Sequence, residues 1–426
     1  MPVPGLRIDH EGMGLSTVCT TVVAAVALAL SCGAAHAGSG LLVGVDDDAL
    51  KWTEDTKGIV AGHQALGLGA IRVTLHWTAG EVKLDDDGRT YTRRAQAAAK
   101  LGLRVVVAVF GDAASPPSTP DMQSQYCAYV QDALSRAKNV RDVVIWNETN
   151  SALFWRPQMG AAAAYESLLA TCYDVLHKYR KQVNVISSTS PHENPAAFIA
   201  QLGAAYRASL RTTPIFDTFG HDAYPEVSTE SPLASHVGTL SLDEGDYVRL
   251  IQALTSAFGG TGQPVPGAGS VPSGGNLPLT VDSRGSFVGA TTPGGPVTIW
   301  YLEDGFETVV PPEKRNVYQG REPNHQLVQP VGSAMRTTAF VQPDQIGQLR
   351  QAFNLAYCQP AVGAIFNFQL ADEVQLGGWQ SGVLWADGTP KPSYAPFKDV
   401  IAGIVAGTVD CVQFSEALIG PKLPQP

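Results

Sequence analysis

The sequence has few charged residues, no concentrated basic segment and no long apolar run. Only 16% of its 426 residues are charged, and the formal net charge is -10. The longest basic segments, Arg93–Arg94 and Lys178–Lys181, are too short for the positive face that a phosphate backbone requires, so nucleic-acid binding is disfavoured. No stretch reaches the roughly 20 apolar residues of a membrane helix. Because 44% of the residues are hydrophobic and lie along the whole chain, disorder, collagen repeats and coiled coil are excluded.

One short apolar run, residues 20–30, lies near the start of the chain. The small residues of Ser31–Ala37 follow it in the pattern that signal peptidase cleaves, so residues 1–37 are interpreted as an export signal. A true start at Met13 and a lipid anchor on Cys32 are the alternatives. The sequence therefore predicts a secreted, periplasmic or cell-surface protein.

Cysteine is scarce, and its number is even after export. Removing residues 1–37 takes Cys19 and Cys32 from the six cysteines and leaves four. In an exported chain an even number indicates two disulfides. Three pairings are possible, and we favour Cys127 with Cys172, on consecutive helices, and Cys358 with Cys411, which would tie down the C-terminal segment. Four unpaired buried thiols remain the alternative.

The usual motifs of several enzyme classes are missing. The nine histidines are scattered without a His-Glu-x-x-His pattern, there is no phosphate loop, and no Gly-x-Ser-x-Gly follows a strand. Asp46–Asp48 lacks the spacing of a calcium loop and is interpreted as a solvated or hydroxyl-binding turn. No metal and no cofactor is predicted.

Short β-branched runs alternate with amphipathic helical patterns, which is typical of βα units around a parallel sheet. Eight strands are predicted, at residues 41–45, 70–75, 104–110, 143–146, 183–187, 216–219, 297–302 and 363–368. Helices are predicted at 56–66, 93–101, 119–137, 161–181, 194–210, 242–258 and 344–356. Eight such units favour a single (β/α)8 TIM barrel, an α/β fold. A doubly wound sheet would show a Gly-rich turn after the first strand, which is missing here.

The barrel is predicted to occupy residues 38–413 with extended loops. Residues 259–296, rich in Gly and Pro, precede the seventh strand and are expected to be an insertion on the N-terminal face. Residues 307–341 form a long loop over the C-terminal face, where Tyr318, Arg321 and His325 could line a substrate-covering wall. Residues 414–426 are expected to be a flexible tail.

Barrel enzymes carry their reacting groups at the C-terminal ends of strands. Those positions hold Arg72, His76, Trp77, Asn147, Glu148, His221, Tyr224, Glu303 and Phe366–Gln369. Strands four and seven lie on opposite sides of a barrel, so Glu148 and Glu303 would face one another. A proton-holding carboxyl group opposite an ionised one suits cleavage of a glycosidic bond. Arg72 would favour the charged form of Glu303, and that charge would hold the proton on Glu148.

Aromatic side chains near these strand ends suit sugar binding, because a ring face matches the apolar C–H face of a pyranose. Trp77 and Trp379 are the candidates chosen from this group. An oligosaccharide, polysaccharide or glycoside is therefore the predicted binding partner. The sequence does not indicate the oligomeric state.

The motif order resembles a large clan of retaining (β/α)8 glycoside hydrolases that includes cellulase-like and β-xylosidase-like families. Residues 143–150 are similar to its fourth-strand Asn-Glu motif, residues 299–306 to its seventh-strand glutamate motif, and residues 216–225 to its sixth-strand His and Tyr segment. Arg72 matches the second-strand arginine, and residues 378–394 are similar to the segment after strand eight. The chain departs from the clan at Leu302, where Thr or Ser is usual.

The resemblance implies roles for individual residues. Glu148 would be the general acid/base and Glu303 the nucleophile, while Asn147 would donate to the sugar 2-hydroxyl. Tyr224 and Arg72 would hold Glu303, and His221 and Trp379 would bind substrate. The implied activity is hydrolysis of glycosidic bonds by double displacement in a secreted protein, and β-linked substrates are expected because most members of the clan act on them. A non-catalytic carbohydrate-binding barrel and a transglycosylase remain the alternatives.

Overall fold

A computed structural model describes residues 40–266, 280–281, 287–288, 297–323, 326–330, 343–414 and 417–418. These residues belong to one compact unit. The predicted export signal, His325, much of the two long insertions and most of the predicted C-terminal tail lie outside the described residues.

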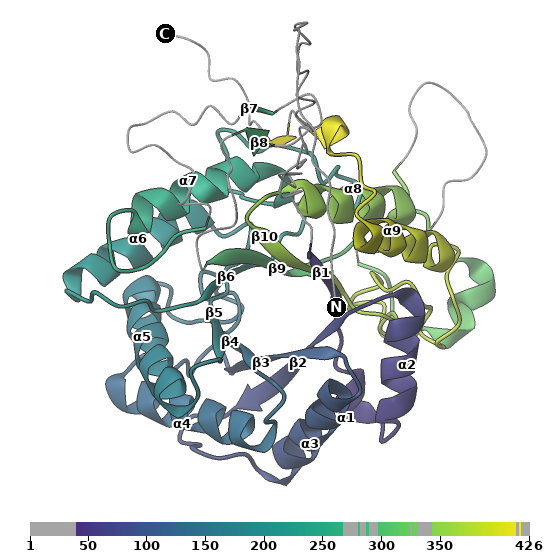
Figure 1. The fold of residues 1–426 in the computed structure, drawn as a ribbon. Coiled ribbons are helices and arrows are strands. Elements are labelled where there is room, and N and C mark those ends of the chain that lie inside the picture. Colours follow the sequence, from purple (N-terminus) through teal and green to yellow (C-terminus); the bar gives the residue numbers. More distant parts are fainter. Residues whose placement is uncertain are drawn as a thin grey trace, which may run out of the picture. The chain divides into compact units, whose positions relative to one another are not determined.

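Eight parallel strands close into a barrel, which confirms the (β/α)8 prediction (Figure 1). The ring runs in the order β1-β10-β9-β6-β5-β4-β3-β2, with β1 hydrogen-bonded to both β10 and β2. The strands are β1 (Leu42–Asp46), β2 (Ala70–Trp77), β3 (Arg104–Gly111), β4 (Asp142–Ile145), β5 (Asn184–Ile186), β6 (Thr218–His221), β9 (Thr298–Asp304) and β10 (Val362–Phe368).

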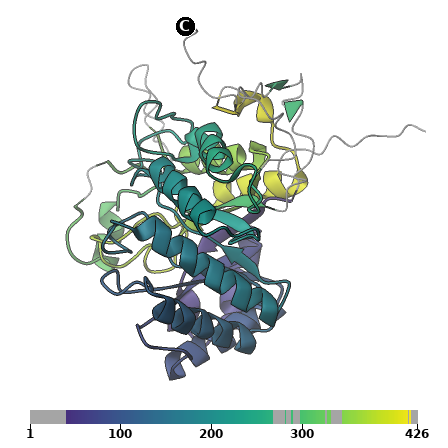
Figure 2. The same ribbon diagram turned by 90° about the vertical axis from the view of Figure 1, so that its left-hand side faces the viewer.

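Helices surround the barrel, and Figure 2 shows several of them side by side along its flank. The α-helices are α1 (Ala49–Trp52), α2 (Thr56–Leu66), α3 (Asp86–Lys100), α4 (Pro120–Arg136), α5 (Ala161–Tyr179), α6 (Pro195–Ala208), α7 (Tyr247–Phe258), α8 (Gln345–Cys358) and α9 (Tyr394–Ala406). The described residues also include the 3₁₀ turns η1 (Glu244–Asp246), η2 (Pro312–Val317) and η3 (Cys411–Phe414).

Side-chain caps explain where several helices begin. The Thr119 side chain accepts from the Met122 amide ahead of Pro120, the first residue of α4, as the Thr-Pro pair predicted. Asn194 caps α6 in the same way, again before a proline. A free N–H group at each helix start is thereby satisfied by a residue whose type is visible in the sequence.

Several elements differ from their predicted bounds, and α7, for example, begins at Tyr247, five residues later than predicted. Helix α3 begins at Asp86, seven residues before the predicted start, because Asp85 caps it by accepting from the Gly88 amide. Strand β6 covers Thr218–His221, two residues later than predicted. His221 is therefore the last residue of a strand, and Asp222 is the first residue beyond it.

Apolar side chains fill the inside of the barrel. Residues from alternating strand positions form this inner cluster, which consists of Ala70, Val106, Ala108, Val144, Ile186, Trp300, Leu302, Ala364 and Phe366. A Cβ atom at Gly44 would lie 2.5 Å from the Phe366 ring, so the first strand needs a glycine there. A larger apolar core lies between the strands and the helices. The barrel is thus packed, and chemistry is confined to its ends.

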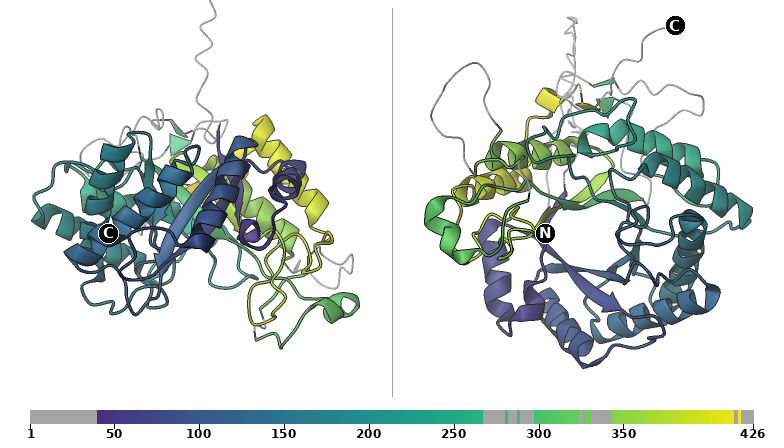
Figure 3. Two further views of the ribbon diagram at one scale, coloured as in Figure 1. Left: turned by 90° about the horizontal axis from the view of Figure 1, so that it is seen from below. Right: turned by 180° about the vertical axis from the view of Figure 1, so that it is seen from behind.

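The connections before and after β9 are the longest in the barrel. Before β9, β7 (Thr280–Val281) pairs with β8 (Phe287–Val288) as a short antiparallel ribbon. After β9, the loop that carries η2 runs beside the loop after β10, joined by a bridge between Gln319 and Gln375 (Figure 3). The Lys314 ammonium also donates to Asp387 Oδ2 at 2.8 Å.

Both favoured disulfides are present. Cys127 of α4 is bonded to Cys172 of α5, and Cys358 at the end of α8 is bonded to Cys411 in η3. The pairing confirms the prediction over the free-thiol alternative. Among the described residues, no helix combines the length and apolar character that crossing a bilayer requires.

Candidate active site

Polar side chains from five strands meet at the C-terminal end of the barrel. Arg72 of β2 is in register with Asp46, the last residue of β1. Glu303 is the penultimate residue of β9. Asn147 and Glu148 follow β4, and Tyr224 follows β6. The strand ends that the motifs selected therefore share one edge of the barrel.

Arg72 is the centre of this group. Its side chain is 1% exposed, and Nη1 donates to Glu303 Oε1 at 2.6 Å and to Asp46 Oδ2. Nη2 donates to Asn147 Oδ1 at 2.7 Å. Burial opposes the guanidinium charge, but Asp46 and Glu303 outweigh it, and the pKa of Arg72 lies above its ordinary value. One fixed cation thus orients three neighbouring side chains.

Glu303 is held from two sides. While Arg72 binds Oε1, the Tyr224 hydroxyl donates to Oε2 at 3.1 Å. Burial and then the charge of Glu303 raise the pKa of Tyr224 well above its ordinary value, so the phenol keeps the proton that it donates. A carboxylate that accepts a hydrogen bond on each of its oxygens is fixed in orientation.

Glu148 has the opposite electrostatic environment. Burial, followed by repulsion from Glu303, raises the pKa of Glu148 to about 8. Its carboxyl group lies within hydrogen-bonding reach of Asp222, and the charge of Arg72 lowers its pKa only in part. The two carboxyl groups therefore differ, because Glu148 has a raised pKa and Glu303 is paired with a cation.

The backbone at the end of β4 is unusual. Trp146 and Glu148 both have positive φ, 64° and 36°, a region that side chains other than glycine rarely adopt. The Trp146 amide donates a hydrogen bond to the Tyr126 hydroxyl, and the Glu148 amide donates one to the Ser188 hydroxyl at 3.0 Å. Backbone strain of this kind persists where surrounding contacts fix it, and it is concentrated at functional sites.

Trp379 lies where a sugar could stack. Its ring is half-buried and packs against Tyr224, with centroids 5.0 Å apart, and edge-on against Phe368 at 5.3 Å. The three rings form an aromatic wall beside Glu303, because Tyr224 belongs to both groups. An apolar face next to a carboxylate pair suits a pyranose ring.

Two predicted substrate-binding residues do not join this group. Trp77 is 1% exposed, packs edge-on against Tyr126 and Trp146, and donates its indole N–H to the Glu81 carbonyl. His221 is fully buried, with Nδ1 2.9 Å from the Thr189 hydroxyl and Nε2 2.6 Å from the Leu242 carbonyl.

The packing and hydrogen bonds of Trp77 and His221 therefore stabilise the fold. Burial lowers the pKa of His221 to about 4, so the ring is neutral and supports the loop after β6. Neither side chain has a polar group left to offer a substrate, and we leave both out of the proposed site.

The predicted wall after β9 is only partly described. Tyr318 is 6% exposed, and its hydroxyl donates to Asp372 Oδ2 at 2.6 Å, so it packs between loops. Arg321 is exposed, and His325 lies outside the described residues. Tyr318 therefore stabilises the loop rather than lining a wall.

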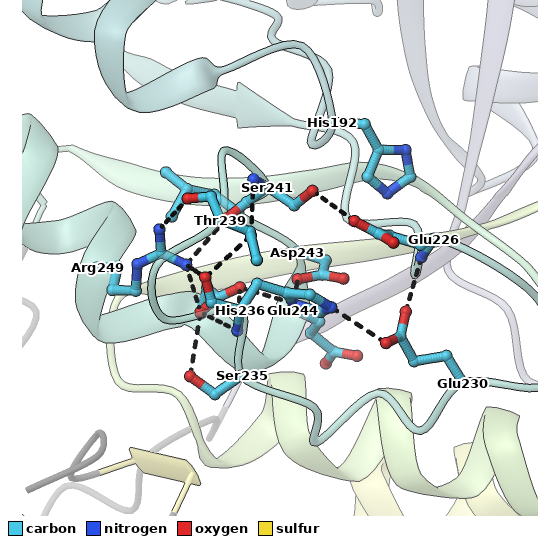
Figure 4. A network of polar contacts seen from close by, with 12 residues as sticks. His192, Glu226, Glu230, Ser235, His236, Thr239, Ser241, Asp243, Glu244 and Arg249 are labelled. Carbon is cyan, nitrogen blue, oxygen red and sulfur yellow. Dashed lines mark hydrogen bonds and ion pairs between the residues drawn. The ribbon is translucent and has the colours of Figure 1, made fainter.

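A second polar cluster occupies the loop between β6 and α7 (Figure 4). Among the residues that the structure describes, Glu230, His236 and Asp243 offer ligand atoms within 4.8 Å of one another and could hold a metal ion. However, His236 Nδ1 already lies 2.6 Å from Asp243 and 3.0 Å from Asp246, and Nε2 lies 3.1 Å from Glu230. A protonated imidazole explains this arrangement, since both ring nitrogens then donate.

Two residues of this group were not predicted from the sequence. The sequence predicts a solvated or hydroxyl-binding turn at Asp46, but Asp46 is 7% exposed and paired with Arg72. Asp222, fully buried beside Glu148, was not singled out. The spacing from Tyr224 could have indicated Asp222. Side chains two residues apart in an extended chain share a face, and Asp222 rather than His221 is two residues from Tyr224.

No protein-family model matches the chain, and no curated protein matches it in sequence. Solved structures do. One is a family 39 glycoside hydrolase from the gut symbiont Bacteroides cellulosilyticus WH2, with a TM-score of 0.53 and 14% identity over 86% of this chain and 64% of that one. The GH53 catalytic domain of Ignisphaera aggregans gives 0.53 and 14% over 85% and 96%.

A β-glucosidase from Thermotoga maritima gives a TM-score of 0.52 and 11% identity over 87% of this chain and 99% of that one. This chain thus spans about two thirds of the Bacteroides protein and nearly all of the other two chains. The likeness at these identities is one of fold. The chain shares its (β/α)8 barrel with glycoside hydrolases, the kind of protein that its motif order resembles.

Proposed function

We propose that the chain is an exported retaining glycoside hydrolase in which Glu303 is the nucleophile and Glu148 the general acid/base. The observation that carries the proposal is that the two carboxyl groups have different electrostatic environments. Arg72 and Tyr224 hold Glu303 by hydrogen bonds, whereas burial and the charge of Glu303 raise the pKa of Glu148 to about 8. This is the division of roles that double displacement requires.

In the first step a Glu303 oxygen attacks the anomeric carbon while Glu148 transfers its proton to the glycosidic oxygen. The bond to the aglycone breaks, the alcohol leaves, and a glycosyl ester of Glu303 forms. In the second step Glu148, now a carboxylate, takes a proton from water, and the resulting hydroxide displaces Glu303 from the sugar. Both groups return to their starting protonation states.

The neighbouring residues orient these groups. Arg72 and Tyr224 fix Glu303, and the Asn147 amide, whose oxygen accepts from Arg72, keeps its N–H donors for a sugar hydroxyl. Trp379 and Tyr224 offer the apolar face on which the ring rests. We propose β-linked saccharides or glycosides as substrates, in line with the β-glucosidase that shares the fold.

Export is part of the proposal. The two disulfides support an oxidising compartment, where such bonds form and persist. The apolar run at residues 20–30 supplies the expected signal.

A nucleophile variant tests the proposal. Glu303→Ala should abolish turnover of every aryl β-glycoside that the wild type cleaves, and azide should restore part of it. Because azide then reacts in a single displacement, the glycosyl azide should have the anomeric configuration opposite to the substrate. Glu313→Ala, on the exposed η2 turn, is the control. Undiminished activity of Glu303→Ala would refute the assignment.

The acid/base variant should behave differently. Glu148→Ala should keep turnover of substrates with good leaving groups and lose it for poor ones, since only the latter need protonation. Azide then attacks the glycosyl-enzyme, so its product should keep the substrate's configuration. Adding alcohols as acceptors shows whether water or another hydroxyl takes the sugar, and glycan binding without any turnover would favour a non-catalytic barrel.

A further inference from the structure

Asp222 is a carboxyl group with no evident counter-charge of its own. It directly follows β6 and is fully buried, and its amide donates to the Thr189 carbonyl at 2.9 Å. Among the described residues, no N–H group and no hydroxyl donates to either carboxyl oxygen. Its carboxyl group lies within hydrogen-bonding reach of the carboxyl group of Glu148, and such a contact forms a hydrogen bond only if one of the two groups carries a proton.

The charges nearby explain why this contact needs a proton. Arg72 is the cation among the groups that most affect the pKa of Asp222. Its guanidinium N–H groups, however, already donate to Asp46, Glu303 and Asn147. Glu303 and Glu148 are the other groups that act most strongly on Asp222, and both are acidic. An ionised Asp222 would be a buried charge without a partner, which is strongly unfavourable.

We propose that Asp222 is a neutral carboxylic acid whose O–H donates to Glu148, which makes it a positioning residue for the general acid/base. The inference rests on the proposed function and deepens it. Burial, and then the charges of Glu303 and Glu148, raise the pKa of Asp222 well above its ordinary value, in agreement with the neutral form.

The hydrogen bond acts on Glu148 in both steps. When Glu148 has passed its proton to the leaving oxygen, the Asp222 O–H stabilises the new carboxylate, because a hydrogen bond to the charged form favours it. In the second step the same bond holds the carboxylate while it takes a proton from water. Asp222 keeps its own proton throughout, so the two-step reaction balances without it.

Several neighbouring groups together determine the pKa of Glu148. Glu303 on β9 and Glu193 after β5 raise its pKa, whereas Arg72 on β2 and the Asp222 hydrogen bond lower it. Removing the hydrogen-bond donor should therefore raise the pKa of Glu148, and replacing it by another neutral donor should not. An ionised Asp222 would act in the opposite direction, by repulsion.

Two variants separate these cases. Asp222→Asn is neutral and keeps an N–H donor, whereas Asp222→Leu has a similar shape and no donor. The measurement is kcat/KM against pH with an aryl glycoside that the wild type cleaves, since its basic limb reports the proton on Glu148 in the free enzyme. Asp304→Asn is the matched control, because Asp304 is also a buried carboxyl group and follows Glu303 in the chain, but it is not among the groups that act most strongly on Glu148.

The expected result is a basic limb near pH 8 for the wild type, for Asp222→Asn and for the control. Asp222→Leu should shift this limb upward by about one pH unit and lower turnover about tenfold to a hundredfold, the effect of losing a hydrogen bond to a charged group. A downward shift in Asp222→Asn would show an ionised Asp222 and overturn the proposal. An unshifted limb in Asp222→Leu would leave only a packing role and overturn it as well.

Infrared difference spectroscopy tests the protonation without substrate. The wild type at pH 7 should show a buried carboxylic-acid C=O band that Asp222→Asn lacks, and absence of the band contradicts the inference even if Asp222→Leu fails to fold. Failure of the proposed function looks different, since the wild type would then cleave no glycoside while the band remains.

Discussion

Arg72 and Glu303 are 231 residues apart in the sequence, yet Arg72 Nη1 lies 2.6 Å from Glu303 Oε1. Their strands, β2 and β9, are not neighbours in the ring, so the contact crosses the mouth of the barrel. It couples the stability of the barrel end to the orientation of the proposed nucleophile.

Replacing Arg72 should therefore impair both folding and turnover. Arg72→Ala leaves Asp46 and Glu303 buried without their cation, and we expect a loss of about 3–5 kcal/mol in the free energy of unfolding. Arg72→Lys keeps the charge but loses the fork that reaches three acceptors, so kcat/KM should fall about a hundredfold. Urea unfolding and kinetics measure the two effects.

Arg141→Lys is the control for Arg72, because the Arg141 side chain is 57% exposed. Wild-type stability and turnover of Arg72→Lys would contradict the central position of this arginine.

Removing the Tyr224 hydroxyl should affect chemistry more than stability. In Tyr224→Phe the ring still packs against Trp379 and Phe368, but the 3.1 Å hydrogen bond to Glu303 is lost. A hydrogen bond to a charged group contributes about 1.5–3 kcal/mol, so kcat/KM should fall about tenfold to a hundredfold. The comparison is Tyr129→Phe, whose hydroxyl donates to the His76 carbonyl, where we expect changed stability and unchanged kinetics.

Glu148→Gln should stabilise the protein, but only at high pH. Below about pH 4.5 Glu148 is protonated in both the folded and the unfolded chain, so the variant should match the wild type. As the pH rises towards 8, the unfolded chain ionises while the folded one keeps its proton, and the wild type progressively loses stability. Above pH 8 the difference should level off, on the order of 5 kcal/mol.

Thermal unfolding between pH 4 and pH 9 measures this dependence, with Glu313→Gln as the control for removal of an exposed acid. A difference in Tm between Glu148→Gln and the wild type that stays constant over that range would show that the pKa of Glu148 is not raised in the folded protein.

The disulfide between α4 and α5 should contribute measurably to stability. Cys127 and Cys172 are fully buried and close a loop with a sequence separation of 45. The loss of loop-closure entropy predicts about 4 kcal/mol, or about 5 °C in Tm for a barrel of this size. The double variant Cys127→Ser/Cys172→Ser should show this loss, and an unchanged Tm would mean that the bond does not form in solution.

The sequence predicted the barrel and most of the site because strand ends determine which residues reach the mouth. Arg72, Asn147, Tyr224 and Glu303 lie together as their strand positions indicated. His221 illustrates the limit. Strand β6 ends at His221, two residues beyond its predicted end, so His221 is a buried strand residue and Asp222, the first residue after the strand, was overlooked.

Contacts between residues that are far apart in the sequence could not be predicted either. The sequence around Asp46 reads as an acidic turn, and only the closure of β1 against β2 shows that Arg72 is its partner. Burial of Trp77 likewise depends on Tyr126 and Trp146, which come from other parts of the chain.

The central claim is that Glu303 forms a covalent bond to the sugar. An activated 2-deoxy-2-fluoro glycoside slows the second step more than the first, so the glycosyl-enzyme should accumulate. Intact mass spectrometry should then show the addition of one fluoroglycosyl group, peptide mapping should locate it on Glu303, and Glu303→Gln should remain unlabelled. Label on any other carboxyl group, or turnover that yields the inverted anomer with no labelled enzyme, would contradict the account.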